Sequence, residues 1–197
     1  MSAKPKKVTV KKSTVKNDLL NAATALLSEH GQAGASVRAI CNAVGVKPPT
    51  LYYHYGELDV LHDKAIGQVF AQTYECYKPA SEAGDALQSI KQSWELFLDF
   101  AYQNPELYKI LHVKILAGEL PEEVYAAFQN VVSDLEIYAS ERALKISAEQ
   151  AVQLIWASAS GAATLMAAAH FSERVDVRVG EFMLHSVLAY LLEVSAD

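Results

Sequence analysis

The stretch that decides the fold is residues 36–55, which read SVRAICNAVGVKPPTLYYHY. Ser36 is suited to cap a helix, and the apolar residues that follow have the i, i+3, i+4, i+7 spacing of one helix face: Val37, Ile40, Cys41 and Val44. Gly45 predicts the end of that helix, because glycine readily takes the positive φ of a helix C-terminus. Pro48 and Pro49 are tolerated in a first helical turn, so a second short helix is expected from there. Two short helices joined by about four residues predict a helix-turn-helix.

Helical patterns continue on both sides of this motif. Before it, apolar residues recur every three or four positions over residues 14–30, which predicts a helix that begins at Ser13 or Thr14 and stops at Gly31. After it, a connecting helix is expected over residues 59–77. Five further start signals follow: Asp85 with Gln88, Asn104-Pro105-Glu106, Pro121-Glu122-Glu123, Ser147 with Gln150, and Asp176. The chain is therefore predicted to be all-α, with about nine helices and no strand.

Composition supports a folded helical chain. The 197 residues are 51% hydrophobic and 20% charged, which does not fit the disordered class. Only 9 glycines and 6 prolines are present, too few for the frequent turns of a β-sandwich or barrel. Cys41 and Cys76 fit neither a disulfide scaffold nor a CxxC motif, so we expect a reducing compartment. No apolar segment follows the N-terminal lysines as in a signal peptide, and the expected location is the cytoplasm.

Residues 150–172 carry no formal charge, which raises the question of a membrane span. The segment is rich in alanine and polar residues, and its flanks, Glu149 and Glu173, lack a positive-inside asymmetry. We therefore expect no membrane association. A helix without a polar face needs cover nearly all round, and a partner subunit is a natural source of that cover.

Charge is distributed unevenly along the chain. Residues 1–66 hold nine basic and five acidic side chains, a net charge of +4, whereas the remainder carries −10. A basic segment joined to an acidic one is expected when only one part meets a polyanion. Residues 1–12 are predicted to form a disordered basic arm. The alternative is a lysine tail that serves solubility alone.

The second helix of the motif carries hydrogen-bonding side chains of the kind that reach phosphates and base edges. No carboxylate lies among them, and they are Lys47, Thr50, Tyr52, Tyr53 and His54. Arg38, on the outer face of the preceding helix, is suited to donate to guanine or phosphate, although a solvated arginine is an equally good interpretation. For Tyr53 and Tyr55 we expect core packing.

At this point the chain resembles a known family. Gly45-Val46, Thr50-Leu51-Tyr52 and His54, together with the amphipathic helix before them, are similar to the DNA-binding region of the tetracycline-repressor (TetR) family over about residues 14–66. The resemblance implies that Thr50, Tyr52, His54 and Arg38 contact DNA, with Pro48 and Pro49 closest to the groove floor. Together with Lys47, the predicted DNA-binding residues are Arg38, Lys47, Pro48, Pro49, Thr50, Tyr52 and His54.

One position departs from the family pattern. Three residues after the aromatic that ends the second helix the family usually has a phosphate-binding lysine, and this chain has Leu58, preceded by Glu57. An acidic side chain suits a helix N-terminus but repels a phosphate there. We expect the lysines from Lys4 to Lys16 to supply compensating phosphate or minor-groove contacts.

The rest of the chain resembles the family in helical character and length. We expect a helix-turn-helix DNA-binding domain over residues 13–58 and a helical effector-binding and dimerisation domain over 59–197. A single short helix reads few base pairs, so a homodimer on a palindromic operator is expected. Its interface is assigned to the helices at 148–171 and 177–194, which alternatively form an intramolecular core.

A small-molecule effector pocket is implied by the resemblance. The expected function is a DNA-binding transcriptional repressor that an effector of unknown identity releases from DNA. Aromatics at helical spacing also suit a plain core. The predicted effector-binding residues are Trp94, Phe97, Tyr108, His112, Phe128, Trp156, Met166 and His170.

Other function classes have less support. No nucleotide-binding loop, nucleophile elbow or zinc-protease motif is found, so we expect no enzymatic activity and no cofactor. A metal site made from His54, Asp59, His62 and Asp63 is crossed by a helix boundary, and none is expected. The remaining alternative is a helical protein-interaction module without DNA binding, which Leu58 and the acidic net charge favour.

Overall fold

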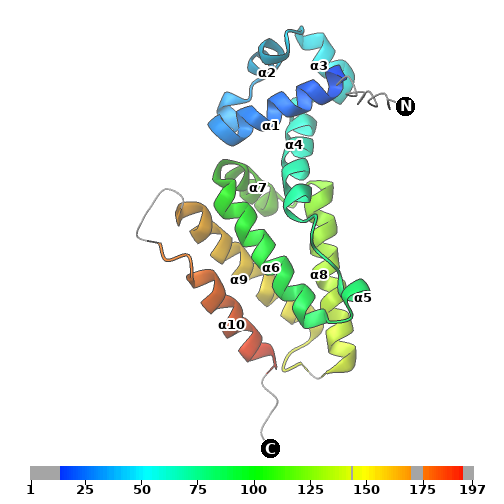
Figure 1. The fold of residues 1–197 in the computed structure, drawn as a ribbon, viewed down its shortest axis with the longest axis vertical. Helices are drawn as coiled ribbons and strands as arrows, with labels where there is room; N and C mark the ends of the chain where they lie inside the picture. Colours follow the sequence, from blue (N-terminus) through cyan, green and yellow to red (C-terminus); the bar gives the residue numbers. More distant parts are fainter. Residues whose placement is uncertain (1–13, 143, 170–174, 193–197) are drawn as a thin grey trace, which may run out of the picture.

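The computed structural model describes residues 14–142, 144–169 and 175–192, and within them the chain is all-α, without a strand. Figure 1 shows α1–α3 at one end of an elongated molecule and a helical bundle at the other, joined by α4. The helices are α1 (Val15–Gly34), α2 (Val37–Val44), α3 (Pro48–Tyr55), α4 (Leu58–Thr73), α5 (Ala80–Ala83), α6 (Ala86–Gln103), α7 (Pro105–Ala117), α8 (Glu122–Glu141), α9 (Ala148–Ala169) and α10 (Val179–Leu192). The all-α prediction is confirmed. The basic arm expected over residues 1–12 lies outside the described residues.

The described part of the chain contains ten helices, whereas about nine were expected. The additional helix is α5, a single turn of four residues that has no apolar repeat of its own. The connecting helix expected over 59–77 begins one residue earlier and ends at Thr73. Beyond it the chain turns toward α8, where the backbone N–H of Ala80 donates to Asp134 Oδ1 at 2.8 Å. A tertiary hydrogen bond therefore sets this boundary.

The helix caps predicted from the sequence are present at the ends of the first helices. Thr14 Oγ1 accepts from the Asn17 N–H, and Ser36 Oγ accepts from the Ala39 N–H. Gly31 has φ 64°, so the regular part of α1 ends where expected, although one more turn follows before Ala35. Gly45 closes α2 in the left-handed conformation, with φ 75°. Three residues separate α2 from α3, one fewer than expected.

One side chain from each of the first four helices builds the N-terminal core. These four side chains are fully buried: Leu19, Ile40, Leu51 and Leu61. The same apolar cluster continues through Ile66 and Phe70 of α4 into the bundle. Helix α4 thus belongs both to the helix-turn-helix end and to the bundle.

Ion pairs connect α4 to the bundle. Lys114 of α7 is nearly buried, and its Nζ lies 2.7 Å from Asp63 Oδ1 and 3.5 Å from Asp59 Oδ2. Lys64 Nζ lies 3.1 Å from Glu122 Oε2 of α8. Because Lys114 has little access to water, its two carboxylate partners compensate for the loss of hydration. These ion pairs connect α4 to α7 and to α8.

Helix α9 is long and apolar enough to cross a membrane by length and composition, but it packs in the bundle against α6, α7, α8 and α10. Burial within the chain covers 39% of its most apolar 18 residues, less than the nearly complete cover expected from its composition. Ala157, Gly161 and Leu165 are exposed. The fold of one chain therefore leaves one side of α9 uncovered.

Candidate nucleic-acid interface and ligand cavity

Two contacts fix α3 on the rest of the motif. Leu51 is fully buried and orients the helix. The Tyr55 hydroxyl donates to the Lys16 carbonyl oxygen of α1 at 2.7 Å, and Lys16 Nζ lies 5.6 Å from the centre of the Tyr55 ring. Burial raises the pKa of the Tyr55 phenol, so the hydroxyl stays protonated as a donor. The outer side of α3 is therefore held in a defined orientation.

The outward side of α2 and α3 carries the predicted DNA-binding residues. Thr50 and His54 are half-buried, and the others are exposed: Arg38, Lys47, Pro48, Pro49 and Tyr52. No carboxylate occurs within α3. The structure brings these seven residues to one end of the molecule, where α3 has free access from outside (Figure 1).

Tyr53 was expected in the core, and that expectation is wrong. Its side chain is 84% exposed, the largest exposed fraction among the large apolar side chains of the described residues. Its ring makes an edge contact with His54, with ring centres 5.1 Å apart. Sequence reasoning missed it because aromatic character alone does not reveal on which side of a short helix the core lies. Tyr53 joins the candidate interface.

Leu58 and Glu57 stand where the family pattern has a basic residue. Glu57 is exposed at the N-cap of α4, and Leu58 is half-buried and packs on the apolar cluster. An apolar side chain at this position serves packing between α4 and the motif. Neither residue offers a cation to a phosphate.

His62, Asp59 and Asp63, which were considered as metal ligands and set aside, have other partners in the structure. The His62 ring Nε2 lies 3.0 Å from the Ala35 carbonyl oxygen, and Asp59 and Asp63 pair with Lys114. Within the described residues no three His, Cys, Asp or Glu side chains come together as metal ligands. These side chains serve packing and ion pairing in this arrangement.

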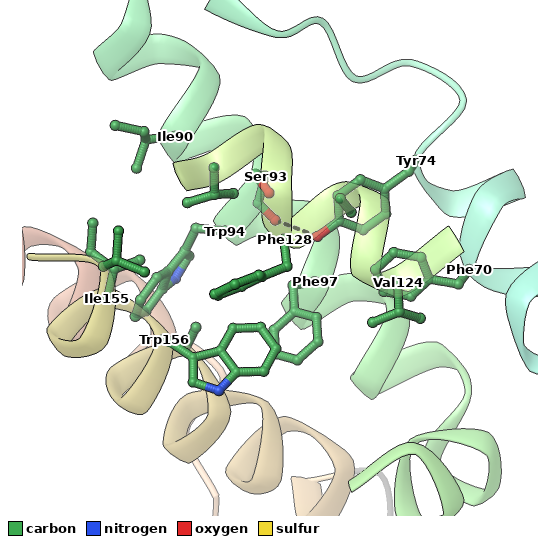
Figure 2. A pocket seen from close by; sticks show the side chains of 14 residues that line it. Phe70, Tyr74, Ile90, Ser93, Trp94, Phe97, Val124, Phe128, Ile155 and Trp156 are labelled. Carbon is green, nitrogen blue, oxygen red and sulfur yellow. Dashed lines mark hydrogen bonds between the residues drawn. The ribbon is translucent and has the colours of Figure 1, made fainter. Parts of the chain in front are cut away.

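A cavity lies in the bundle between α4, α6, α8 and α9. Figure 2 shows aromatic rings around it, and its volume is about 50 Å³. Phe128 and Trp156 meet edge to face, with ring centres 5.0 Å apart, and Phe97 lies 6.0 Å from Trp156. The lining consists of Phe70, Tyr74, Ile90, Ser93, Trp94, Phe97, Val124, Ala127, Phe128, Val131, Val152, Ile155, Trp156 and Ala159.

Polar groups in this lining are few. The Tyr74 hydroxyl donates to the Ser93 carbonyl oxygen at 2.9 Å, as the dashed line in Figure 2 marks. Burial raises the pKa of Tyr74 far above its ordinary value, so this phenol stays neutral. No Asp, Glu, Lys, Arg or His side chain belongs to the lining.

Comparison with known proteins agrees with this architecture. Residues 19–58 match the sequence model of a family described as "Bacterial regulatory proteins, tetR family". The helix-turn-helix end of the chain thus matches the TetR family. The family resemblance that the sequence predicted is supported, and with it a DNA-binding helix-turn-helix.

Solved structures of TetR proteins share the fold along nearly the whole chain. A TetR-like transcriptional regulator from Rhodococcus sp. RHA1 is 19% identical, covering 91% of this chain and 98% of its own, with a TM-score of 0.60. BioQ from Mycobacterium smegmatis is 15% identical, with 88% and 95% covered and a TM-score of 0.67. A TetR transcription regulator from Haloarcula marismortui is 14% identical, with 90% and 96% covered and a TM-score of 0.67. No curated protein matches the chain.

The structure of this chain brings together only half of the predicted effector-binding residues in one cavity. Trp94, Phe97, Phe128 and Trp156 line the cavity. Met166 is buried on α9 outside the lining, and His170 lies outside the described residues. Sequence reasoning missed the aliphatic lining residues, which no local pattern separates from ordinary core.

Tyr108 and His112 of α7 also lie outside the lining of this cavity. The Tyr108 hydroxyl lies 3.0 Å from the Ser160 carbonyl oxygen, to which it donates, and 3.1 Å from Thr164 Oγ1. The centres of the Tyr108 and His112 rings are 5.8 Å apart. Tyr108 therefore belongs to the contact between α7 and α9, and the His112 ring lies beside it.

Proposed function

We propose that this TetR-family protein is a transcriptional repressor that binds a palindromic operator as a homodimer and leaves it when a small molecule binds in the bundle. The single observation that carries the DNA-binding part is the outer side of α3. It is free of carboxylates and is held in place by Leu51 and Tyr55.

The residues proposed to contact DNA are the seven predicted from the sequence, together with Tyr53. Lys47 and Arg38 supply positive charge for phosphates, and Arg38 also suits the bidentate acceptors of guanine. Thr50 and His54 offer short donors to base edges, and the Tyr52 hydroxyl offers one to a phosphate. Such a set combines phosphate contacts, which position the helix, with base contacts, which specify the sequence.

The homodimer is proposed to form through α9 and α10. Helix α10 lies at the edge of the bundle beside α9 and on the side away from α8 (Figure 1). Two shallow grooves run between α9 and α10, and Phe182 and Tyr190 at their margins are exposed. If α9 and α10 of one copy pack on α9 and α10 of a second copy, they form a four-helix contact with two-fold symmetry.

Release from DNA is proposed to work through α4. At about 50 Å³ the cavity is smaller than the roughly 300 Å³ at which ligand pockets begin, so a ligand must push its walls apart. One wall consists of Phe70 and Tyr74 of α4, and the same helix packs on α1 and α3. A ligand that displaces α4 favours a conformer in which the two copies of α3 are wrongly spaced for DNA.

We propose that residues 1–12 are a basic arm, that residues 13–58 are the DNA-binding domain, and that residues 59–197 are the effector-binding and dimerisation domain. The basic residues from Lys4 to Lys16 are proposed to add backbone contacts that Leu58 does not provide. A cytoplasmic location follows from the proposed access to DNA.

The test is a triple substitution, Arg38→Ala, Thr50→Ala and His54→Ala, measured on a duplex that the protein protects next to its own gene. We expect affinity to fall about 100-fold or more, because each well-made base contact contributes on the order of 1–3 kcal/mol. A matched control, Arg142→Ala with Tyr125→Ala on α8, removes an exposed arginine and an exposed ring away from α3.

Circular dichroism verifies that the variants fold. Unchanged affinity in a folded triple variant overturns the proposal. The salt dependence of binding separates the alternative, a helical interaction module without DNA binding, because a DNA binder loses affinity steeply as salt rises.

A further inference from the structure

The cavity contains one polar atom that the fold leaves without a partner. Trp94 is 3% exposed, and no acceptor among the described residues lies within hydrogen-bonding distance of its Nε1. Of the polar side-chain atoms in the lining, it is the one both buried and unpaired. Buried N–H groups are nearly always paired in folded proteins, so this one is a candidate ligand donor.

The position of this nitrogen suits a molecule inside the cavity. In Figure 2 the nitrogen of Trp94 lies on the side of its ring toward Phe128, whereas that of Trp156 lies on the side away from Phe128. A molecule between these rings thus has one donor within reach. The Tyr74 hydroxyl is already engaged with the Ser93 carbonyl oxygen.

The lining also defines the charge and shape of its ligand. It holds no side chain that is charged at neutral pH, so a charged ligand would lose its hydration without gaining a counter-ion. Aromatic rings come from all four of its helices, with Phe70 of α4, Phe97 of α6, Phe128 of α8 and Trp156 of α9. Such a set favours a flat ring, which gains stacked and edge contacts.

We propose that the cavity binds an uncharged aromatic molecule that carries a hydrogen-bond acceptor, and that the indole N–H of Trp94 donates to this acceptor. Only the regulatory meaning of this binding rests on the proposed function. The walls must move apart to admit even a single ring, so the first ligands are small.

Three probes of similar shape test separately the need for an acceptor and the exclusion of charge. Acetophenone is uncharged with an acceptor, cumene is uncharged without one, and benzoate carries a charge. Trp94 and Trp156 are the two tryptophans of the chain, so tryptophan labelled with ¹⁵N gives two indole N–H signals. The variant Trp156→Phe assigns them.

We expect acetophenone to shift the Trp94 indole proton downfield, as a new hydrogen bond does, and cumene to bind without that shift. Benzoate should not bind at the concentrations at which acetophenone saturates the protein. In Trp94→Phe, the ratio of acetophenone affinity to cumene affinity should fall about fivefold, because a hydrogen bond contributes on the order of 1 kcal/mol. Using the ratio cancels the difference in hydrophobicity, and Tyr125→Phe, at an exposed ring outside the lining, should leave it unchanged.

Equal ratios in the wild type and in Trp94→Phe overturn the proposal, as do binding of benzoate or no binding of any probe. If Trp94→Phe fails to fold, the proton shift in the wild type decides alone. DNA binding is measured separately. A protein that holds acetophenone through Trp94 yet stays on DNA contradicts effector release and leaves the ligand class standing.

Discussion

Leu51 and Tyr53 are two positions apart on α3, and at 3.6 residues per turn that spacing puts them on opposite sides of the helix. Leu51 is fully buried, and Tyr53 is 84% exposed. A large ring that is exposed to water contributes little to the stability of one folded chain. Its position on the exposed side of α3, in contact with His54, makes it available to a partner.

We predict that Tyr53→Ala weakens DNA binding by about tenfold and leaves stability nearly unchanged. Surface substitutions of this kind usually shift the free energy of unfolding by less than about 0.5 kcal/mol. Fluorescence anisotropy with the protected duplex gives the affinity, and thermal unfolding gives the stability. Tyr125→Ala, at a 53% exposed ring on α8, is the control and should change neither. A variant that binds DNA as well as the wild type removes Tyr53 from the interface.

At the scale of elements, α4 is the helix that both ends of the molecule share. Its first turns pack on α1 and α3, its last turns form a wall of the cavity, and ion pairs hold it to α7 and α8. Gly67 lies so close to Glu123 of α8 that a Cβ atom there would clash with its carboxylate. Helix α4 is thus the element that joins the cavity wall to the helix-turn-helix.

The segment after α4 is anchored on α8 through Asp134. This carboxylate is 1% exposed and accepts from the Tyr77 hydroxyl and the Ala80 N–H. Burial, and then the contact with Asp134, raise the pKa of the Tyr77 phenol far above 10. The folded chain thus keeps a proton that the unfolded chain loses as pH passes 10.

We predict that the ionisation of Tyr77 leaves the free energy of unfolding unchanged below pH 10. Above pH 10 this free energy should decline, because the unfolded state then releases the proton of Tyr77. In Tyr77→Phe this decline should be shallower, as measured by denaturant unfolding between about pH 9 and pH 11. Tyr125→Phe removes an exposed hydroxyl and should reproduce the wild-type profile. An identical profile in Tyr77→Phe would show that Tyr77 ionises equally in both states.

At the scale of the whole molecule, one chain leaves apolar surface on α9 and α10 uncovered. Leu165, Phe182 and Tyr190 are each 39–54% exposed although both helices are highly apolar. Stable homodimers commonly cover such faces. The fold of the monomer is complete without this contact, because the inner sides of α9 and α10 already pack on α6.

We predict that Phe182→Glu converts the protein to a monomer with unchanged helical content. A carboxylate buried at the two-fold contact would face its own copy without a counter-charge. Sedimentation at micromolar concentration measures the change, and affinity for the palindrome should fall with it. Tyr125→Glu, at a ring of nearly equal exposure on α8, should remain a dimer. A wild-type monomer, or a dimeric Phe182→Glu, contradicts the assignment of α9 and α10.

The sequence by itself determined the helical class, the caps at Thr14, Ser36 and Gly45, and the helix-turn-helix, because these follow from interactions within a few residues. It also pointed to Trp94, Phe97, Phe128 and Trp156 as aromatic neighbours. Capping and periodicity are local, so a linear pattern records them.

The tertiary structure alone decided which side of α3 faces outward, and so that Tyr53 is exposed. It decided that α4 ends at Thr73, since Asp134 lies 61 residues further along the chain and redirects the segment. It placed Tyr108 on the contact with α9, with His112 beside it, and both outside the lining of the cavity. Each outcome depends on how whole helices pack against one another, and that packing brings together residues whose spacing in the sequence holds no period.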